Sequence, residues 1–139
     1  MKFNLPKIVR PVLLTDFAPE LTHDDGSPAI VQVWANPPSA LPTRYRELSE
    51  RSKSAIDALK ALKADDDKAA VITELNTVGN ALAALFAELW SQHADPATHW
   101  TAEEVGALAN SQENPALYPW LTGRTIAAIG EYRSRIRKN

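Results

Sequence analysis

The sequence predicts a mainly α-helical fold with a small N-terminal β-hairpin, followed by a helical hairpin and two C-terminal helices (an α+β arrangement). Seven of the ten prolines lie in residues 1–42, and proline removes a backbone donor and disrupts helix interiors. From residue 43 onward, alanine, leucine and charged residues favour helices. We expect one domain over residues 1–139, with a proline-rich β segment at 1–42 and a helical bundle at 43–139.

Two apolar stretches within the first 42 residues are typical of β-strands. Residues 8–14 contain Pro11, and residues 29–35 are rich in β-branched side chains. Residues 23–28 form a turn signal between them, because Asp and Gly tolerate turn conformations. We therefore expect a β-hairpin with Pro11 at an edge or a bulge. An isolated hairpin is marginal in water, so it must pack on the helices, pair with another chain, or both.

Hydrophobic spacing predicts two long helices in the middle of the chain. Residues 43–64 and 68–92 carry apolar residues at alternating intervals of three and four, which places them on one helix face. The acidic joint at residues 65–67 ends the first helix and offers a cap for the second, which predicts an antiparallel helical hairpin. Further bulky apolar residues lie beside these stripes: Ile56, Ile72, Phe86 and Trp90.

The sharpest local pattern is a capping box that opens a short helix. Thr101 is the expected N-cap, Glu104 is its reciprocal partner, and Trp100 with Val105 forms a hydrophobic staple. This short helix should end near residue 109.

The last helix is predicted to begin near Asn114-Pro115 or at Pro119, since proline suits a first helical turn. Its final segment is basic, with Arg133, Arg135 and Arg137. A solvated helix terminus that complements the helix dipole is the simplest interpretation. Contact with nucleic acid or with an acidic protein partner is the alternative.

Composition and motifs argue against several classes of enzyme. The chain has no cysteine, which excludes disulfides, zinc–thiolate sites, iron–sulfur clusters and thiol nucleophiles. Its five glycines are isolated, and neither a phosphate-binding loop nor a nucleophile elbow is present. His93 and His99, with Asp95 between them, lack the spacing of a known metal site. We therefore expect no enzyme activity, no cofactor and no metal.

Charge and hydropathy restrict the partners. The chain has 15 Lys+Arg against 17 Asp+Glu, a net charge of −2, which argues against coating nucleic acid by bulk charge. No apolar run approaches the ~20 residues that span a bilayer, and the N-terminus lacks the apolar core of a signal peptide. We expect an intracellular protein without a membrane segment.

The four tryptophans are candidates for either the core or an interface. Core packing is the default interpretation, although tryptophan is enriched at interaction hot spots. Trp34, on the marginal β-hairpin, is the best interface candidate among them.

Three segments together resemble the tail assembly chaperones of long-tailed bacteriophages. They are Val31-Gln32-Val33-Trp34-Ala35-Asn36-Pro37-Pro38, the capped helix at residues 100–108, and Asn114-Pro115-Ala116-Leu117-Tyr118-Pro119-Trp120-Leu121 with the following Gly123-Arg124-Thr125-Ile126 and basic tail. The order of these parts and the small size match most of the chain.

The resemblance implies a protein that binds the tape measure protein, keeps it soluble and helps recruit the major tail protein. It implies no catalysis, a place in the host cell cytoplasm and absence from the mature virion. A chaperone for helices needs apolar surface that accepts amphipathic partners, and part of that surface is expected to stay exposed or to be shared between copies in a homo-oligomer. The expected partner-binding residues are Trp34, Ile72, Phe86, Trp90, Trp120, Arg133, Arg135 and Arg137.

Three other functions stay open from the sequence. The first is a small nucleic-acid-associated regulator that uses the basic C-terminal helix. The second is a structural head–tail or tail-completion subunit. The third is a metal-dependent enzyme.

Overall fold

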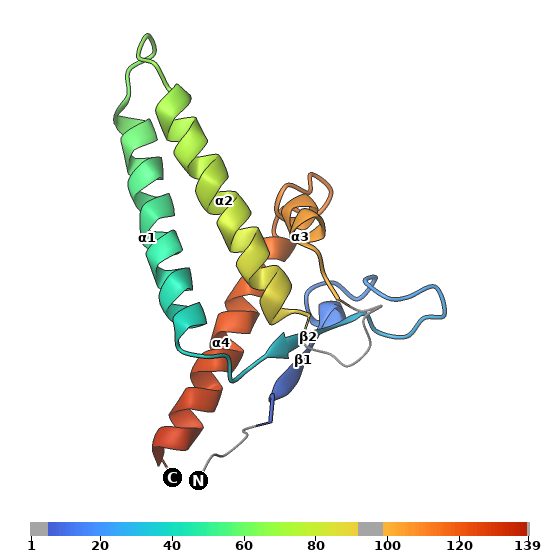
Figure 1. The fold of residues 1–139 in the computed structure, drawn as a ribbon. Coiled ribbons are helices and arrows are strands. Elements are labelled where there is room, and N and C mark those ends of the chain that lie inside the picture. The colour runs from blue at the N-terminus through green and yellow to red at the C-terminus, as the bar shows by residue number, and fades with distance from the viewer. Residues whose placement is uncertain (1–5, 92–98, 139) are drawn as a thin grey trace.

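Helices make up most of the chain in the computed structural model, which describes residues 6–91 and 99–138 (Figure 1). The mainly helical fold with a small N-terminal β-ribbon is confirmed. The elements follow the order β1 (Val9–Leu13), the 3-10 helix η1 (Leu14–Asp16), β2 (Ile30–Trp34), α1 (Ala40–Ala61), α2 (Ala69–Leu89), α3 (Ala102–Ala109) and α4 (Leu117–Lys138).

Strands β1 and β2 form the predicted antiparallel pair. Their register runs unbroken from Val9 opposite Trp34 to Leu13 opposite Ile30, so Pro11 pairs with Gln32 without a bulge. Both strands of a two-stranded ribbon are edges, where the missing proline N–H is tolerated. The connection is longer than a tight hairpin turn, because η1 and an isolated β-bridge lie within it.

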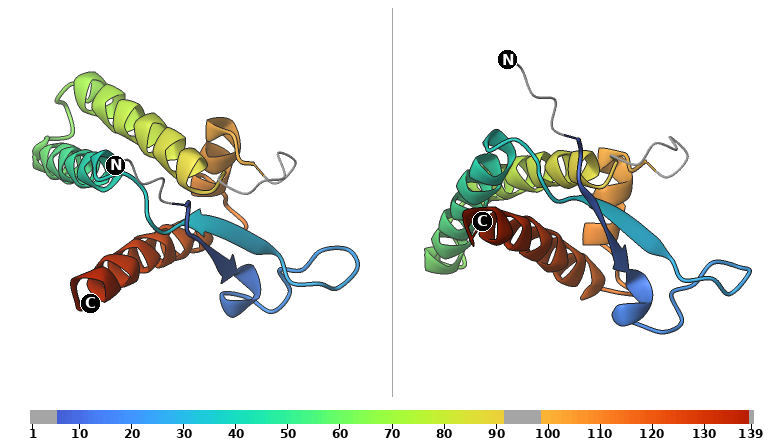
Figure 2. Two further views of the ribbon diagram at one scale, coloured as in Figure 1. Left: turned by 60° about the horizontal axis from the view of Figure 1, so that its bottom comes forward. Right: turned by 90° about the horizontal axis from the view of Figure 1, so that it is seen from below.

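Helices α1 and α2 form an antiparallel hairpin that projects away from the rest of the fold (Figures 1 and 2). Helix α1 begins at Ala40, earlier than predicted, because Pro42 lies in its first turn, where a missing N–H breaks no helical hydrogen bond. At the acidic joint, Asp67 Oδ1 accepts the Ala69 N–H at 2.9 Å. The N-cap position itself is Lys68, whose side chain makes no capping hydrogen bond, so the aspartate serves the first turn of α2 from one residue before the cap.

The predicted capping box of α3 is present. Thr101 Oγ1 accepts the Glu104 N–H at 3.1 Å, and Glu104 Oε1 accepts the Thr101 N–H at 3.2 Å. Helix α4 begins at Leu117, between the two predicted starts, with Pro119 in its first turn. It then runs along both strands of the ribbon.

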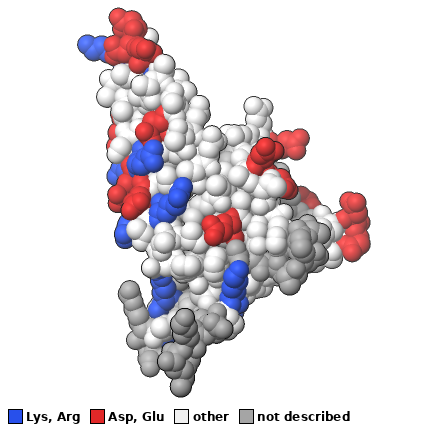
Figure 3. All heavy atoms as spheres, viewed as in Figure 1, with Lys and Arg blue, Asp and Glu red and all other residues white. Residues whose placement is uncertain are grey.

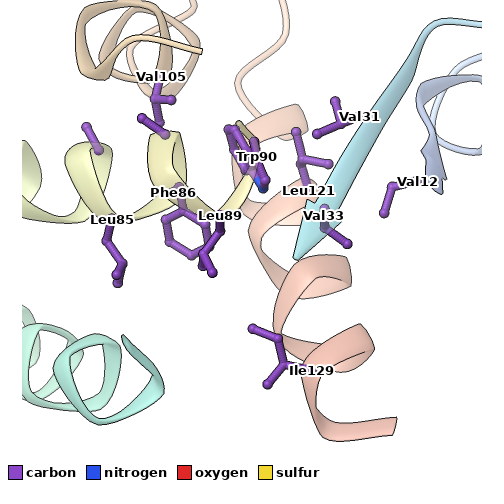
Figure 4. Packing of buried hydrophobic residues seen from close by; sticks show 12 residues of the cluster. Val12, Val31, Val33, Leu85, Phe86, Leu89, Trp90, Val105, Leu121 and Ile129 are labelled. Carbon is purple, nitrogen blue, oxygen red and sulfur yellow. The ribbon is translucent and has the colours of Figure 1, made fainter. Parts of the chain in front are cut away.

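The core lies where the C-terminal half of α2 meets α3, α4 and the ribbon (Figure 4). Trp90 is at its centre, with 1% of its surface exposed, and its indole Nε1–H donates to Thr125 Oγ1 at 3.0 Å. The Thr125 hydroxyl donates in turn to the Leu121 carbonyl at 2.8 Å. The ribbon gains its stability from this packing, as a marginal hairpin requires.

Helix α2 is long and apolar, and only part of its apolar surface is buried. Among the described residues it is the one helix whose length and composition would allow it to cross a membrane, and 22% of its most apolar stretch is buried inside the fold. Thr, Asn and Glu residues interrupt its apolar positions, so α2 holds no unbroken apolar run of ~20 residues and meets the criterion by length and average composition alone. Its uncovered apolar surface needs an explanation.

Candidate functional site

The candidate site is the α1–α2 hairpin, where the fold leaves apolar side chains uncovered. Large hydrophobic residues that are exposed in the described part of the chain are Ile30 (46%), Ile56 (41%), Ile72 (47%) and Ile136 (56%). Two of these lie on the hairpin, Ile56 on α1 and Ile72 on α2. The hairpin has two flanks, which differ in chemistry.

One flank is a groove of about 720 Å³, which we call the acidic groove. It is lined by Glu47, Glu50, Arg51, Ser54, Ala55, Ala58, Ala70, Val71 and Glu74. The lining combines small side chains with three carboxylates and one guanidinium. Arg51 on α1 forms an ion pair with Glu74 on α2, which ties the two helices together across the groove. Because both side chains are about half exposed, the pair adds little to stability.

The opposite flank is an uncharged strip of aliphatic, serine and glycine residues, which we call the hairpin face. It comprises Ser49, Ser52 and Ile56 of α1 with Ile72, Leu75, Gly79 and Leu82 of α2. A hollow of about 190 Å³ at its base is lined by Tyr45, Ser49, Ser52, Leu82, Phe86, Tyr118 and Thr122. Residues seven positions apart lie nearly in line on an α-helix, so the same face continues from this hollow toward the hairpin tip. Ile56 is therefore in line with Ser49, and Ile72 with Gly79.

An aromatic cluster closes the base of the hairpin face. The Phe86 ring lies 5.8 Å from that of Tyr45 and 6.2 Å from that of Tyr118, both edge-on, which is a favourable geometry. Burial raises the pKa of the Tyr118 phenol above its usual value, and Tyr45 adds to the effect. The α4 end of the face is therefore uncharged at neutral pH.

Phe86 and Trp90 were expected to bind a partner, and the structure buries both side chains, although Phe86 also lines the hollow at the base of the hairpin face. Each side chain is only 1% exposed. Both lie on the half of α2 that α3 and α4 cover, so they stabilise the core instead. Ile72, on the uncovered half of the same helix, is accessible as expected.

Trp34 and Trp120 are half-buried against the core. Trp34 Nε1–H donates to Asn36 Oδ1 at 3.0 Å, which fixes the end of the ribbon. The Trp120 ring lies 5.4 Å from that of Phe17 and 5.8 Å from the Arg124 guanidinium. Both rings therefore have structural contacts and present only part of their surface to a partner.

The basic residues of α4 are remote from the hairpin tip. Arg133 and Arg135 are exposed near the C-terminal end of α4, and that end and the hairpin tip lie at opposite ends of the molecule (Figure 1). Arg137 belongs to α4, but its side chain is outside the described residues. The structure does not bring the expected partner-binding residues together on one surface.

The candidate histidine pair is only half described. His93 lies outside the described residues, and His99 is exposed. Within residues 6–91 and 99–138, no group of three His, Asp or Glu side chains is arranged to hold a metal ion.

Gly79, an exposed glycine on the hairpin face, was not among the residues expected from the sequence to bind a partner. A glycine in a helix interior destabilises the helix by about 1 kcal/mol relative to alanine, and Gly79 lies in the middle of α2. That local conflict with an otherwise strong helical sequence was the available signal.

Comparison of the chain with protein-family models, with curated proteins and with solved structures gave no match.

Proposed function

We propose that this protein is a phage tail assembly chaperone that binds the tape measure protein in the host cell cytoplasm and keeps it soluble. In the same proposal it helps recruit the major tail protein and leaves before the virion is complete. The observation that carries the proposal is the projecting α1–α2 hairpin, whose hairpin face keeps Ile56 and Ile72 uncovered. An amphipathic helix buries its apolar stripe in a groove of this kind.

The physical role follows from the hydrophobic effect. Long helical proteins with uncovered apolar stripes aggregate, and a holder that covers those stripes removes apolar area from water, at about 25 cal/mol per Å². The hairpin offers alkyl and hydroxyl side chains together with an ion pair, which suits holding a polypeptide. We propose no catalytic step and no cofactor.

Co-expression tests the proposal. The tape measure protein of the same genome is expressed with this chain, with an unrelated helical protein of similar size, or alone, and its soluble fraction is measured after centrifugation. We expect this chain to raise the soluble fraction several-fold and to co-purify with the tape measure protein. Equal insolubility in all three samples would overturn the proposal.

The exposed Arg133 and Arg135 favour one second candidate, a nucleic-acid-associated regulator. A gel-shift titration at increasing salt separates the two, because phosphate contacts weaken steeply with salt. Mass spectrometry of purified virions separates the chaperone from a head–tail or tail-completion subunit, since only a structural subunit persists in the particle.

A further inference from the structure

We propose that the hairpin face is the partner-binding site, and that its occupant is an amphipathic helix whose apolar stripe is flanked by acidic residues. The helix would lie between α1 and α2 and complete a three-helix bundle. The inference rests on the proposed function, which it deepens by naming the site and the chemistry of the partner.

Gly79 indicates that a helix has room to pack against the hairpin face. A Cβ added at Gly79 would meet no atom within 4 Å beyond its own helix, so no contact in the described structure requires glycine there. Its φ is not positive, which removes the other usual reason for a glycine. The same open space surrounds the other helical glycines, but Gly79 lies on the hairpin face between Leu75 and Leu82, where it leaves room for a third helix to approach at the 8–10 Å typical of packed helices.

The length of the face suits a helix. From Ile72 to Phe86, α2 extends roughly 21 Å at 1.5 Å per residue. The outer part carries the exposed Ile56 and Ile72, and the inner part continues into the hollow beside Tyr118. The face therefore continues the core outward along the same helices. Beyond the end of α4, no other element of the described structure packs on it.

Charge gives the chemistry of the occupant. Lys53 and Lys60 are exposed and lie one turn on either side of Ile56, so they border the hairpin face along its α1 edge, while the exposed Asp57 lies further round the helix from Ile56. The neighbouring positions on α2 are the uncharged Asn76 and Asn80. Figure 3 shows charged side chains along α1 and an acidic cluster at the hairpin tip. A helix with carboxylates on the side that faces α1 would complement this edge.

The acidic groove fits this occupant less well. The Arg51–Glu74 pair crosses it, so a docking helix would have to displace that pair and place its carboxylates beside Glu47 and Glu50. A second copy of the chain is also less suitable, because it would bring a second pair of lysines to the same edge. An acidic-flanked partner helix is therefore the occupant we propose.

Substitution of Gly79 tests the site without damaging the fold. Gly79→Leu raises helix propensity and fills the open space, so we expect unchanged or higher thermal stability and a several-fold loss of tape measure solubilisation. Gly130→Leu is the matched control, because Gly130 lies on α4, is exposed and also has no neighbour within 4 Å of an added Cβ. It should solubilise as well as the wild type.

Synthetic peptides test the charge argument independently of the tape measure protein. Two fluorescent amphipathic helices share an apolar stripe and carry either Glu or Lys at the flanking positions. Fluorescence anisotropy should show that the Glu peptide binds several-fold more tightly, with a difference that shrinks at high salt. The double variant Lys53→Glu, Lys60→Glu should reverse the preference.

The outcomes separate the inference from the function. If the wild type solubilises the tape measure protein and Gly79→Leu does so equally well, the site is wrong and the function stands. If the wild type fails to solubilise it but binds the Glu peptide at this face, the function is wrong and the site stands. If the chain alone is a dimer in light scattering and Gly79→Leu makes it monomeric, the occupant is a second copy and the inference is overturned.

Discussion

The Trp90–Thr125 hydrogen bond shows how a single polar side chain is accommodated in this core. Thr125 has no exposed surface, yet its hydroxyl accepts from the Trp90 indole and donates to the Leu121 carbonyl. Every buried side-chain nitrogen and oxygen in the described part of the chain has a partner, as native proteins require. The pair therefore joins α2 to α4 at the centre of the fold.

Replacement of Thr125 by Val should destabilise the protein by about 1–3 kcal/mol, because it leaves the buried Trp90 N–H without an acceptor while preserving shape. Urea denaturation followed by tryptophan fluorescence measures the change. Thr125→Ser retains the hydroxyl and should lose less stability. A Thr125→Val protein as stable as the wild type would show that the hydrogen bond contributes nothing to stability.

At the scale of elements, α3 depends on its cap more than the longer helices do. It spans only Ala102–Ala109, and a helix this short is marginal without tertiary contacts and a satisfied first turn. The Thr101–Glu104 box supplies the first-turn partners, and the buried Val105 supplies the packing. This element was predicted from its own residues because capping is local chemistry.

Removal of the cap should weaken α3 and the core beside it. We expect Thr101→Ala to reduce the free energy of unfolding by about 1 kcal/mol, measured by chemical denaturation. Thr101→Ser keeps the accepting oxygen and should stay close to the wild type. A Thr101→Ala protein as stable as the wild type would mean that tertiary packing alone holds α3.

Helix α2 has one continuous apolar stripe, of which one half is buried in the core and the other half is only partly covered. Its apolar stripe runs without a break from Val71 to Leu89, yet the buried residues begin at Val78 and concentrate beyond Ala83. Periodicity predicted the helix and its face correctly. It did not predict where along α2 the face changes from buried to exposed, because that depends on where α3 and α4 pack against it.

At the scale of the whole molecule, stability should be uneven. The ribbon, α3, α4 and the inner half of α2 share one core, whereas the outer part of the hairpin projects away from it (Figure 2). Regions with few buried contacts open at lower free energy than the core.

Native-state hydrogen exchange should therefore show different amide exchange rates in the outer and inner parts of the hairpin. We expect amides near its tip, around Ile56 and Ile72, to exchange faster than those around Phe86 and Leu121, because the outer turns bury less apolar surface. Two-dimensional NMR of the free protein measures the rates. Equal protection along the whole of α2 would contradict this division.

The sequence alone determined the local structure of this protein: the proline-rich ribbon, the antiparallel helical hairpin, the capping box and the last helix. Each depends on residues close together in the chain, through backbone conformation, capping and hydrophobic period. Only the tertiary structure decided that Phe86 and Trp90 are buried while Ile72 and Gly79 are open. Burial is set by elements that are distant in sequence, because apolar surface is covered only where another part of the chain arrives to pack against it.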